Sequence, residues 1–151
     1  DFSYIQNKFD NLVIIFKLKS RADEGKNGFL NNKKYLYSLL KNQKIKYKIV
    51  CDIKDLDGLI ANSEFVLSAP STLAYKSIQL GIPTVLIKDS GQLGNFGEFK
   101  GLVEFDKEKI KNKIDEMVEN PKDINFINNY IEGGLDFNST KVFLDRIREL
   151  I

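Results

Sequence analysis

The fold is decided by residues 56–87, which read LDGLIANSEFVLSAPSTLAYKSIQLGIPTVLI. Residues 56–60 carry apolar side chains at helical spacing, and the apolar run 65–67 is typical of a buried strand. A small polar turn follows, and then a second helix over 73–80, a glycine that ends it, and a second strand over 84–87. The order helix, strand, helix, strand predicts parallel strands that are connected by helices.

The same alternation continues on both sides of this stretch. Short apolar runs predict further strands, and apolar residues at helical spacing recur between them and throughout the tail. The further strands are expected at 12–16, 49–51 and 102–105, and the further helices at 35–40, 110–118, 124–131 and 142–151. The sequence therefore predicts an α/β fold with a Rossmann-like parallel sheet flanked by helices.

Length and composition indicate one globular domain over residues 1–151. Hydrophobic residues make up 42% of the chain and charged residues 29%, which allows a buried core. The net charge is only +2, with both signs mixed along the chain, so we expect no nucleic-acid partner. The sequence shows neither a signal peptide nor an apolar run long enough to cross a bilayer, so a cytoplasmic location is the default expectation.

Cysteine and histidine usage restricts the chemistry that these residues can perform. Cys51 is the only cysteine, and it ends an apolar run, so we expect a buried strand residue rather than a nucleophile. The chain has no histidine, which excludes an imidazole base and most catalytic zinc sites within it. We therefore expect no metal site and assign no catalytic residue.

Three small hydroxyl side chains follow the strand at 65–67. Ser68, Ser71 and Thr72 stand where that strand ends and the next helix begins. Ligands of open parallel sheets bind at the carboxyl ends of strands, and a helix N-terminus offers unpaired N–H groups to a phosphate. A second interpretation stays open, because serine and threonine are also favoured simply as helix caps.

The Ser71-Thr72 pair, followed by Gly81-Ile82-Pro83 and an apolar strand, resembles the donor-site region of GT-B glycosyltransferases. The relatives of these enzymes include the CDP-glycerol glycerophosphotransferases and capsule polysaccharide transferases. Upstream, residues 15–21 are similar to a strand and basic turn of the same families. The resemblance implies the C-terminal half of a GT-B fold, with the Ser/Thr turn at the pyrophosphate of a nucleotide sugar. That nucleotide sugar would be the substrate, and no cofactor is expected.

The basic turn lacks the His and Pro of the family pattern, and one further departure bears on the nucleotide. Many GT-B donor sites place a glutamate that accepts hydrogen bonds from the ribose where this chain has Lys76. A lysine cannot accept those bonds, although it could approach a phosphate or an acidic sugar. The alternative is an ordinary solvated helix residue.

The resemblance also implies contacts outside the Ser/Thr turn. The glycine-rich loop after the strand at 84–87 would lie beside the donor sugar. The alternative for this loop is a surface segment with Phe96 packed beneath it. Lysines at the end of the first strand could face the phosphates, or could be a solvated strand end. The candidates added here are Gly91, Gln92, Gly94, Asn95, Lys17 and Lys19.

In the resembled fold a central strand precedes the one at 12–16, and this chain shows no counterpart. We therefore expect a fragment of a two-domain protein that lacks its first strand and its N-terminal acceptor domain. An interrupted sheet would be closed by self-association, by rearrangement or by a neighbouring domain. Membrane contact, at the inner face, is expected only through the parent protein.

The predicted function is nucleotide-sugar donor binding within a glycosyltransferase of cell-surface polysaccharide or glycoconjugate synthesis, and the chain alone is not expected to be active. Two alternatives stay open. The first is a non-catalytic Rossmann-like binding domain, which Lys76 and the missing histidine favour. The second is a domain like that of the nucleotide-sugar 2-epimerases, which share the fold.

Overall fold

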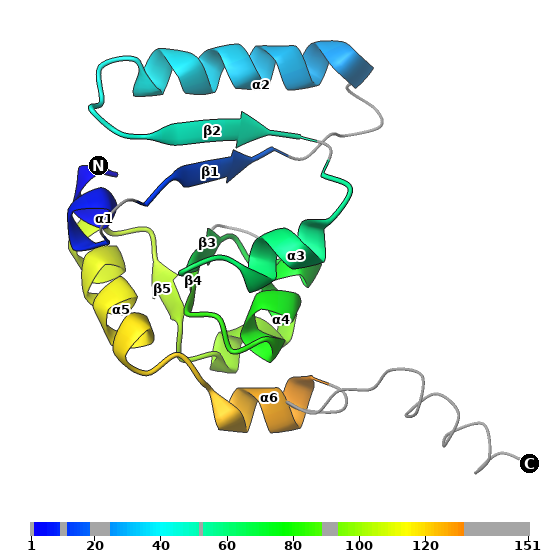
Figure 1. Cartoon of the computed structure of the whole chain (residues 1–151). Coiled ribbons are helices and arrows are strands. Elements are labelled where there is room, and N and C mark those ends of the chain that lie inside the picture. Colours follow the sequence, from blue (N-terminus) through cyan, green and yellow to red (C-terminus); the bar gives the residue numbers. More distant parts are fainter. Residues whose placement is uncertain (1, 10–11, 19–24, 52, 89–93, 132–151) are drawn as a thin grey trace, which may run out of the picture. The chain divides into compact units, whose positions relative to one another are not determined.

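The computed structural model describes residues 2–9, 12–18, 25–51, 53–88 and 94–131. The chain divides into two compact units, Asp1–Lys54 and Asp55–Ile151, which we call unit 1 and unit 2. Each unit contains its own parallel sheet with helices beside it (Figure 1). The α/β class and the Rossmann-like arrangement of parallel strands and helices are therefore confirmed.

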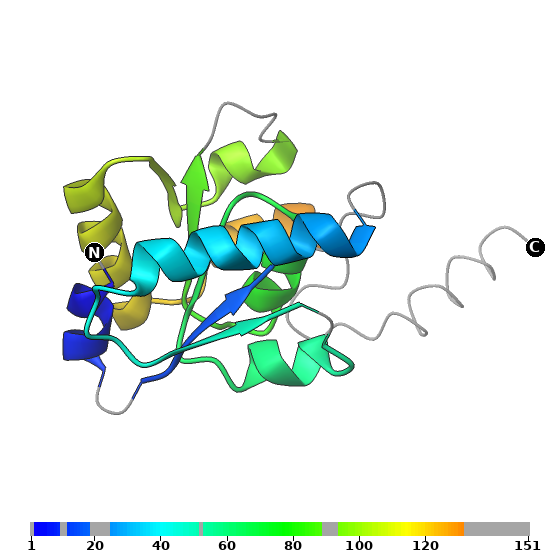
Figure 2. The ribbon, with the colours of Figure 1, turned by 90° about the horizontal axis from the view of Figure 1, so that it is seen from above.

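Unit 1 is a small α/β layer. Its elements are α1 (Ser3–Lys8), β1 (Ile14–Lys17), α2 (Gly25–Leu40) and β2 (Tyr47–Val50). The two strands pair in parallel, with Ile15 opposite Lys48. Helix α2 runs along the two strands in both views (Figures 1 and 2), as a crossover connection between parallel strands should.

The sheet of unit 1 is covered on one face. Phe16 contacts Phe2 at 5.1 Å and Tyr47 at 6.2 Å between ring centroids, and Tyr37 of α2 lies 6.1 Å from Tyr47. On the opposite face, Ile15 is 41% exposed. The strand expected at 12–16 forms as β1, but its apolar run is not fully buried, because alternate residues are exposed. Only the Phe16 and Tyr47 side of the sheet has aromatic side chains and a helix packed against it.

Unit 2 carries the larger sheet. Its elements are α3 (Leu56–Ala61), β3 (Val66–Ser68), α4 (Thr72–Gln79), β4 (Thr84–Lys88), the 3₁₀ helix η1 (Gly94–Glu98), β5 (Leu102–Glu104), α5 (Lys107–Glu119) and α6 (Ile124–Tyr130). The strand order is β3-β4-β5, and both pairs are parallel. Helix α4 packs on β3 and β4, and α5 packs on β4 and β5 from the other side of the sheet (Figure 1).

Strand β4 forms the centre of unit 2. Thr84, Val85 and Leu86 are fully buried because β4 has a strand on each side and a helix on each face. The Thr84 hydroxyl lies 3.0 Å from the hydroxyl of Ser77 on α4 and 2.8 Å from the Ile82 carbonyl oxygen. The buried polar groups are thus hydrogen-bonded, as the low dielectric of a core demands.

Gly81 ends α4 as the sequence predicts. Its φ of +71° is in the left-handed region, which glycine adopts without steric cost. The Gly81 N–H donates to the Ile78 carbonyl at 3.0 Å, and the Ile82 N–H donates to the Ser77 carbonyl, also at 3.0 Å. This pair of bonds is a Schellman motif, and it turns the chain directly from α4 into β4.

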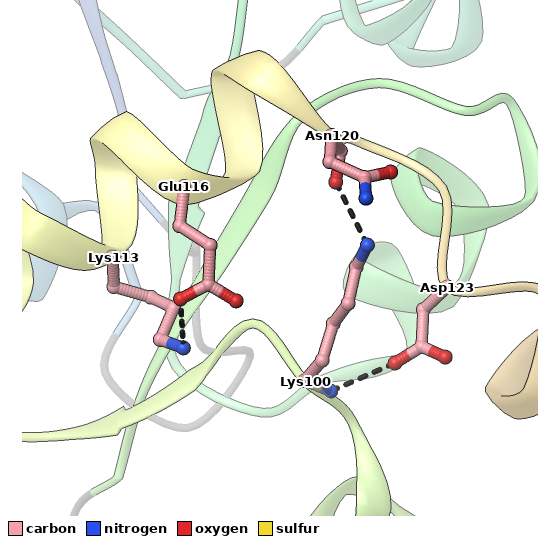
Figure 3. Close-up of polar contacts among 5 residues, drawn as sticks. All are labelled: Lys100, Lys113, Glu116, Asn120 and Asp123. Atoms are coloured by element: carbon pink, nitrogen blue, oxygen red, sulfur yellow. Dashed lines mark hydrogen bonds and ion pairs between the residues drawn. The ribbon is translucent and has the colours of Figure 1, made fainter.

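Lys100 and Asp123 connect the start of β5 to the segment between α5 and α6 (Figure 3). The Lys100 ammonium group donates to the carbonyl oxygens of Asn120 and Lys122, each at 2.8 Å. The Lys100 N–H donates to the Asp123 carboxylate at 2.8 Å, and the same carboxylate accepts the Phe126 N–H at 3.1 Å. Asp123 therefore caps α6 and also fixes the approach to β5.

Most predicted elements form within a few residues of their expected bounds. The strands join into two sheets of two and three members, rather than one continuous sheet. Cys51 follows β2 instead of lying in it, and it is half-buried, because the strand ends at Val50. Helix α1 and the 3₁₀ turn η1 were not predicted, and the helix expected at 142–151 lies outside the described residues.

The double role of Asp123 leads to a stability prediction. Replacing Asp123 by alanine leaves the N–H groups of Lys100 and Phe126 without their acceptor, at a cost of about 2–3 kcal/mol of unfolding free energy. The matched control is Asp106→Ala, which removes an exposed cap from α5 and should cost about 1 kcal/mol. Urea denaturation measures both, and equal losses would contradict the proposed tertiary role of Asp123.

Candidate functional site

The candidate site lies at the carboxyl edge of the β3-β4-β5 sheet. Ser68 is the last residue of β3 and pairs in register with Leu86 of the adjacent β4. Because neighbouring parallel strands end at the same edge, the turn after β3 and the segment after β4 leave the sheet on the same side. Helix α4 begins in that turn, at Thr72. This is the location where open parallel sheets bind ligands.

The N-terminus of α4 has no side-chain cap. Ser71 occupies the N-cap position in an extended conformation, with φ −162° and ψ 163°, and its hydroxyl makes no capping hydrogen bond. The Ala74 N–H donates to the Ser71 carbonyl at 3.0 Å, and Thr72 is exposed. By contrast, the other α-helices in the described part of unit 2 each begin with an aspartate carboxylate that accepts a backbone N–H: Asp55 for α3, Asp106 for α5 and Asp123 for α6.

Ser68 is less available than Ser71. Its hydroxyl donates to the neighbouring Ala69 carbonyl at 2.7 Å, so the proton is already used locally. The hydroxyl oxygen could still accept a hydrogen bond from a ligand. Among the three predicted hydroxyl residues, Ser71 and Thr72 are therefore better placed to donate to an anion.

An aromatic contact connects η1 to α4. The ring of Phe96, which is 5% exposed, lies 4.2 Å from the ring of Tyr75, one turn into α4. Gly94, at φ +52°, and the exposed Asn95 precede Phe96 directly. The contact holds these two predicted sugar-site residues beside the first turns of α4. Phe96 is buried, as the alternative interpretation expected, but residues 89–93 of the loop lie outside the described residues.

Helix α6 completes this aromatic cluster. The Phe126 ring lies 5.9 Å from Phe96, 6.0 Å from Tyr75 and 5.2 Å from Tyr130, between centroids. The hydrogen bond between Tyr130 and the Glu98 carboxylate raises the pKa of the Tyr130 hydroxyl, with smaller contributions from burial and from the negative charge of Glu98. Thus Phe96 of η1 contacts both α4, through Tyr75, and α6, through Phe126.

Lys76 points to α3. Its ammonium group lies 3.2 Å from the Asp57 carboxylate, with the lysine side chain 39% exposed. This ion pair spans two helices that pack together, and a partly exposed pair of this kind contributes about 0–1 kcal/mol. The geometry therefore gives Lys76 a contact that requires no ligand, which matches the solvated-helix alternative more closely than the phosphate role.

The remaining predicted residues are not brought to this edge by described contacts. Lys17 ends β1 in unit 1 and is exposed. Lys19, Gly91 and Gln92 lie outside the described residues. In the described part of the chain, no cluster of three or more acidic, cysteine or histidine side chains could hold a metal ion.

Comparisons of the chain with protein-family models, with curated proteins and with solved structures find no match. Among the helices of the described ranges, none has the length and apolar character needed to span a bilayer. The candidate site is therefore argued from its own geometry.

The contact between Tyr75 and Phe96 is the site feature that sequence reasoning missed. Both residues are visible in the sequence, but they lie 21 positions apart on different elements. Tyr75 follows the Ser71 cap by four residues, which places it on the first turn of a predicted helix. Its partner could not be chosen from the 11 phenylalanines without knowledge of the tertiary fold.

We expect the buried Phe96 to stabilise this edge. Phe96→Ala removes the ring between α4 and α6 and should lower the unfolding free energy by about 3 kcal/mol. The matched control is Phe105→Ala at a ring that is 83% exposed, and we expect a change of no more than about 0.5 kcal/mol. Thermal or urea denaturation of both variants measures the difference. A small effect at Phe96 would mean that η1 is not held by this contact.

Proposed function

We propose that this chain is a donor-binding domain for a nucleotide sugar, within a glycosyltransferase of cell-surface polysaccharide or glycoconjugate synthesis. The diphosphate of the donor would bind at the N-terminus of α4, and the sugar would lie toward η1. The observation that carries the proposal is the uncapped start of α4 at the carboxyl edge of a parallel sheet. The resemblance of residues 56–87 to GT-B donor sites supports the same assignment.

The chemistry of the α4 N-terminus suits a diphosphate. The first backbone N–H groups of a helix have no acceptor within the helix, and the helix dipole places partial positive charge there. Helices α3, α5 and α6 satisfy such groups with an aspartate, whereas α4 presents hydroxyl groups, which carry no charge. A carboxylate cap would repel phosphate, but Ser71 and Thr72 can donate hydrogen bonds to it.

The sugar end of the proposed site is Asn95. Its amide is exposed, and the packing of Phe96 on Tyr75 keeps it beside α4. A side-chain amide has both donor and acceptor groups, so it can bond a sugar hydroxyl in either direction. The positive φ of Gly94 turns the backbone sharply just before Asn95.

The proposal concerns donor binding and leaves the catalytic base unassigned. The chain contains no histidine, and the tyrosine whose pKa is raised, Tyr130, lies on α6 and bonds Glu98. Catalytic bases are usually found where burial and charge move a pKa toward neutrality, whereas the pKa of Tyr130 is raised, away from it. Transfer of the sugar would therefore need a catalytic base other than the residues assigned to donor binding.

Thr72→Glu tests the diphosphate site with two opposite expectations. A glutamate in the first turn of α4 should leave stability unchanged or raise it by about 0.3–1 kcal/mol, because it complements the helix dipole. The same carboxylate should lower affinity for UDP, CDP or GDP at least about tenfold, because it repels the diphosphate. Calorimetric titration with the three nucleotides measures the affinity.

The control for this experiment is Asn112→Glu on the exposed face of α5, which adds the same charge away from the sheet edge. We expect this variant to bind nucleotide like the unmodified chain. Equal affinities of the two variants, or equal losses, would rule out the α4 N-terminus as the phosphate site.

Asn95→Ala tests the sugar end separately. Loss of one or two hydrogen bonds should weaken binding of the preferred nucleotide sugar by about three- to tenfold. Binding of the corresponding nucleoside diphosphate should not change, because that ligand lacks the sugar. Parallel titrations with the two ligands measure the ratio. The assignment of Asn95 fails if both ligands weaken together or if neither does.

A further inference from the structure

The division into two units separates the charges of the chain. Unit 1 holds twelve lysines and arginines against five acidic residues, a net charge of +7. Unit 2 holds eleven against sixteen, a net charge of −5. The small net charge of the whole chain therefore conceals a strongly cationic unit. The expectation that both signs are mixed along the chain does not hold at the level of the units.

Most lysines of unit 1 lie within its described residues. All five acidic residues of the unit, Asp1, Asp10, Asp23, Glu24 and Asp52, lie outside the described residues. The described part of the unit holds ten lysines and no carboxylate side chain. The net charge of +7 already includes these five acidic residues, so the unit as a whole is cationic.

Part of this charge is arranged on the face of the sheet that α2 does not cover. Along the chain from Lys44 to Lys48, exposed lysines alternate with half-buried residues, and β2 begins within this run at Tyr47. Lys48 pairs in register with Ile15 of β1, and in a parallel pair the two side chains share a face. We call this surface, made of Val13, Ile15, Lys17, Lys44, Lys46 and Lys48, the lysine face.

The lysine face combines free cations with exposed aliphatic side chains. Val13 is 50% exposed and Ile15 is 41% exposed. Within the described residues, no ion pair involves Lys17, Lys46 or Lys48. Parallel sheets are normally covered on both faces, so an exposed aliphatic pair between lysines indicates a surface that binds something.

The composition of the face distinguishes among anionic partners. Lysine is depleted from protein–protein interfaces, where arginine and aromatic residues are enriched. Single-stranded nucleic acids are held by aromatic platforms, but the aromatic residues of this sheet, Phe16 and Tyr47, lie on the opposite, covered face. Clusters of lysine beside aliphatic side chains suit anionic lipid. The ammonium groups can reach the lipid headgroups while the lysine methylene groups and the aliphatic side chains contact the apolar part of the bilayer surface.

We propose that the lysine face of unit 1 docks directly on a bilayer surface that contains anionic lipid. This contact would be made by the chain itself, whereas the sequence suggested membrane contact only through a parent protein. It does not depend on the proposed nucleotide site, which lies in unit 2. Binding is electrostatic with a small aliphatic contribution, so salt should weaken it strongly. The binding that persists at high salt should depend on the aliphatic contact of Ile15.

The test is co-sedimentation of the full chain with vesicles of phosphatidylglycerol and phosphatidylcholine in equal parts, against vesicles of phosphatidylcholine alone. We expect binding only to the anionic vesicles, and a strong decrease between about 0.01 M and about 1 M salt, as the Debye length falls from about 30 Å to about 3 Å. Replacing Lys46 and Lys48 together by glutamate should lower the affinity at least about tenfold. Ile15→Ser should reduce the binding that persists at high salt.

The matched control replaces Lys107 and Lys122 of unit 2 by glutamate, which changes the net charge equally at exposed positions. This variant should keep most of the vesicle affinity, and circular dichroism should show all variants folded. Equal loss in the two double variants would mean that only net charge matters, and equal binding to both vesicle types would remove the role of anionic lipid. Absence of vesicle binding together with binding of an oligothymidine strand, abolished by the Lys46 and Lys48 changes, would assign the face to nucleic acid. Each of these three outcomes overturns the proposal.

Discussion

Parallel pairing on both sides of β4 is the constraint on which unit 2 depends. A parallel strand cannot return by a tight turn, so each neighbour of β4 must be reached through a crossover. The crossover from β3 to β4 places α4 on one face of the sheet, and α5, which follows β5, packs on the other face. This double cover leaves Thr84, Val85 and Leu86 without solvent contact. The same geometry gathers the carboxyl ends of the strands at one edge. The core and the candidate site therefore follow from one arrangement.

The ends of α4 show how the core and the site are joined. At its C-terminus, Gly81 closes a Schellman motif and sends the chain into β4, where Thr84 bonds back to Ser77. These bonds fix the position of the helix on the sheet. At its N-terminus, the Ser71 side chain makes no capping hydrogen bond. A helix held firmly at one end can present unpaired groups at the other, because its stability does not depend on a cap there.

Unit 1 also has parallel strands joined by a crossover helix, but a helix covers only one face of its sheet. Its two parallel strands are connected by α2, and the aromatic contacts of Phe16 and Tyr47 fill the covered face. The other face carries lysines and two aliphatic side chains in place of a packed helix. The two proposed surfaces both concern phosphate groups, yet they differ in chemistry. The α4 turn offers directed N–H and hydroxyl donors to one ligand, whereas the lysine face offers diffuse charge to an extended surface.

The sequence by itself determined the elements and their order, because apolar periodicity, glycine stops and helix caps are local signals. It located β4 to within a residue, placed the end of α4 at Gly81, and set Ser71 and Thr72 at a strand end. Pairings between distant residues were decided only by the tertiary structure. Local pattern could not show that Phe96 packs on Tyr75, that Lys76 meets Asp57, or that Lys100 reaches the carbonyl groups after α5. It also could not show that Ile15 lies on an exposed face or that the charges separate between two units, since both depend on which surfaces the folded chain covers.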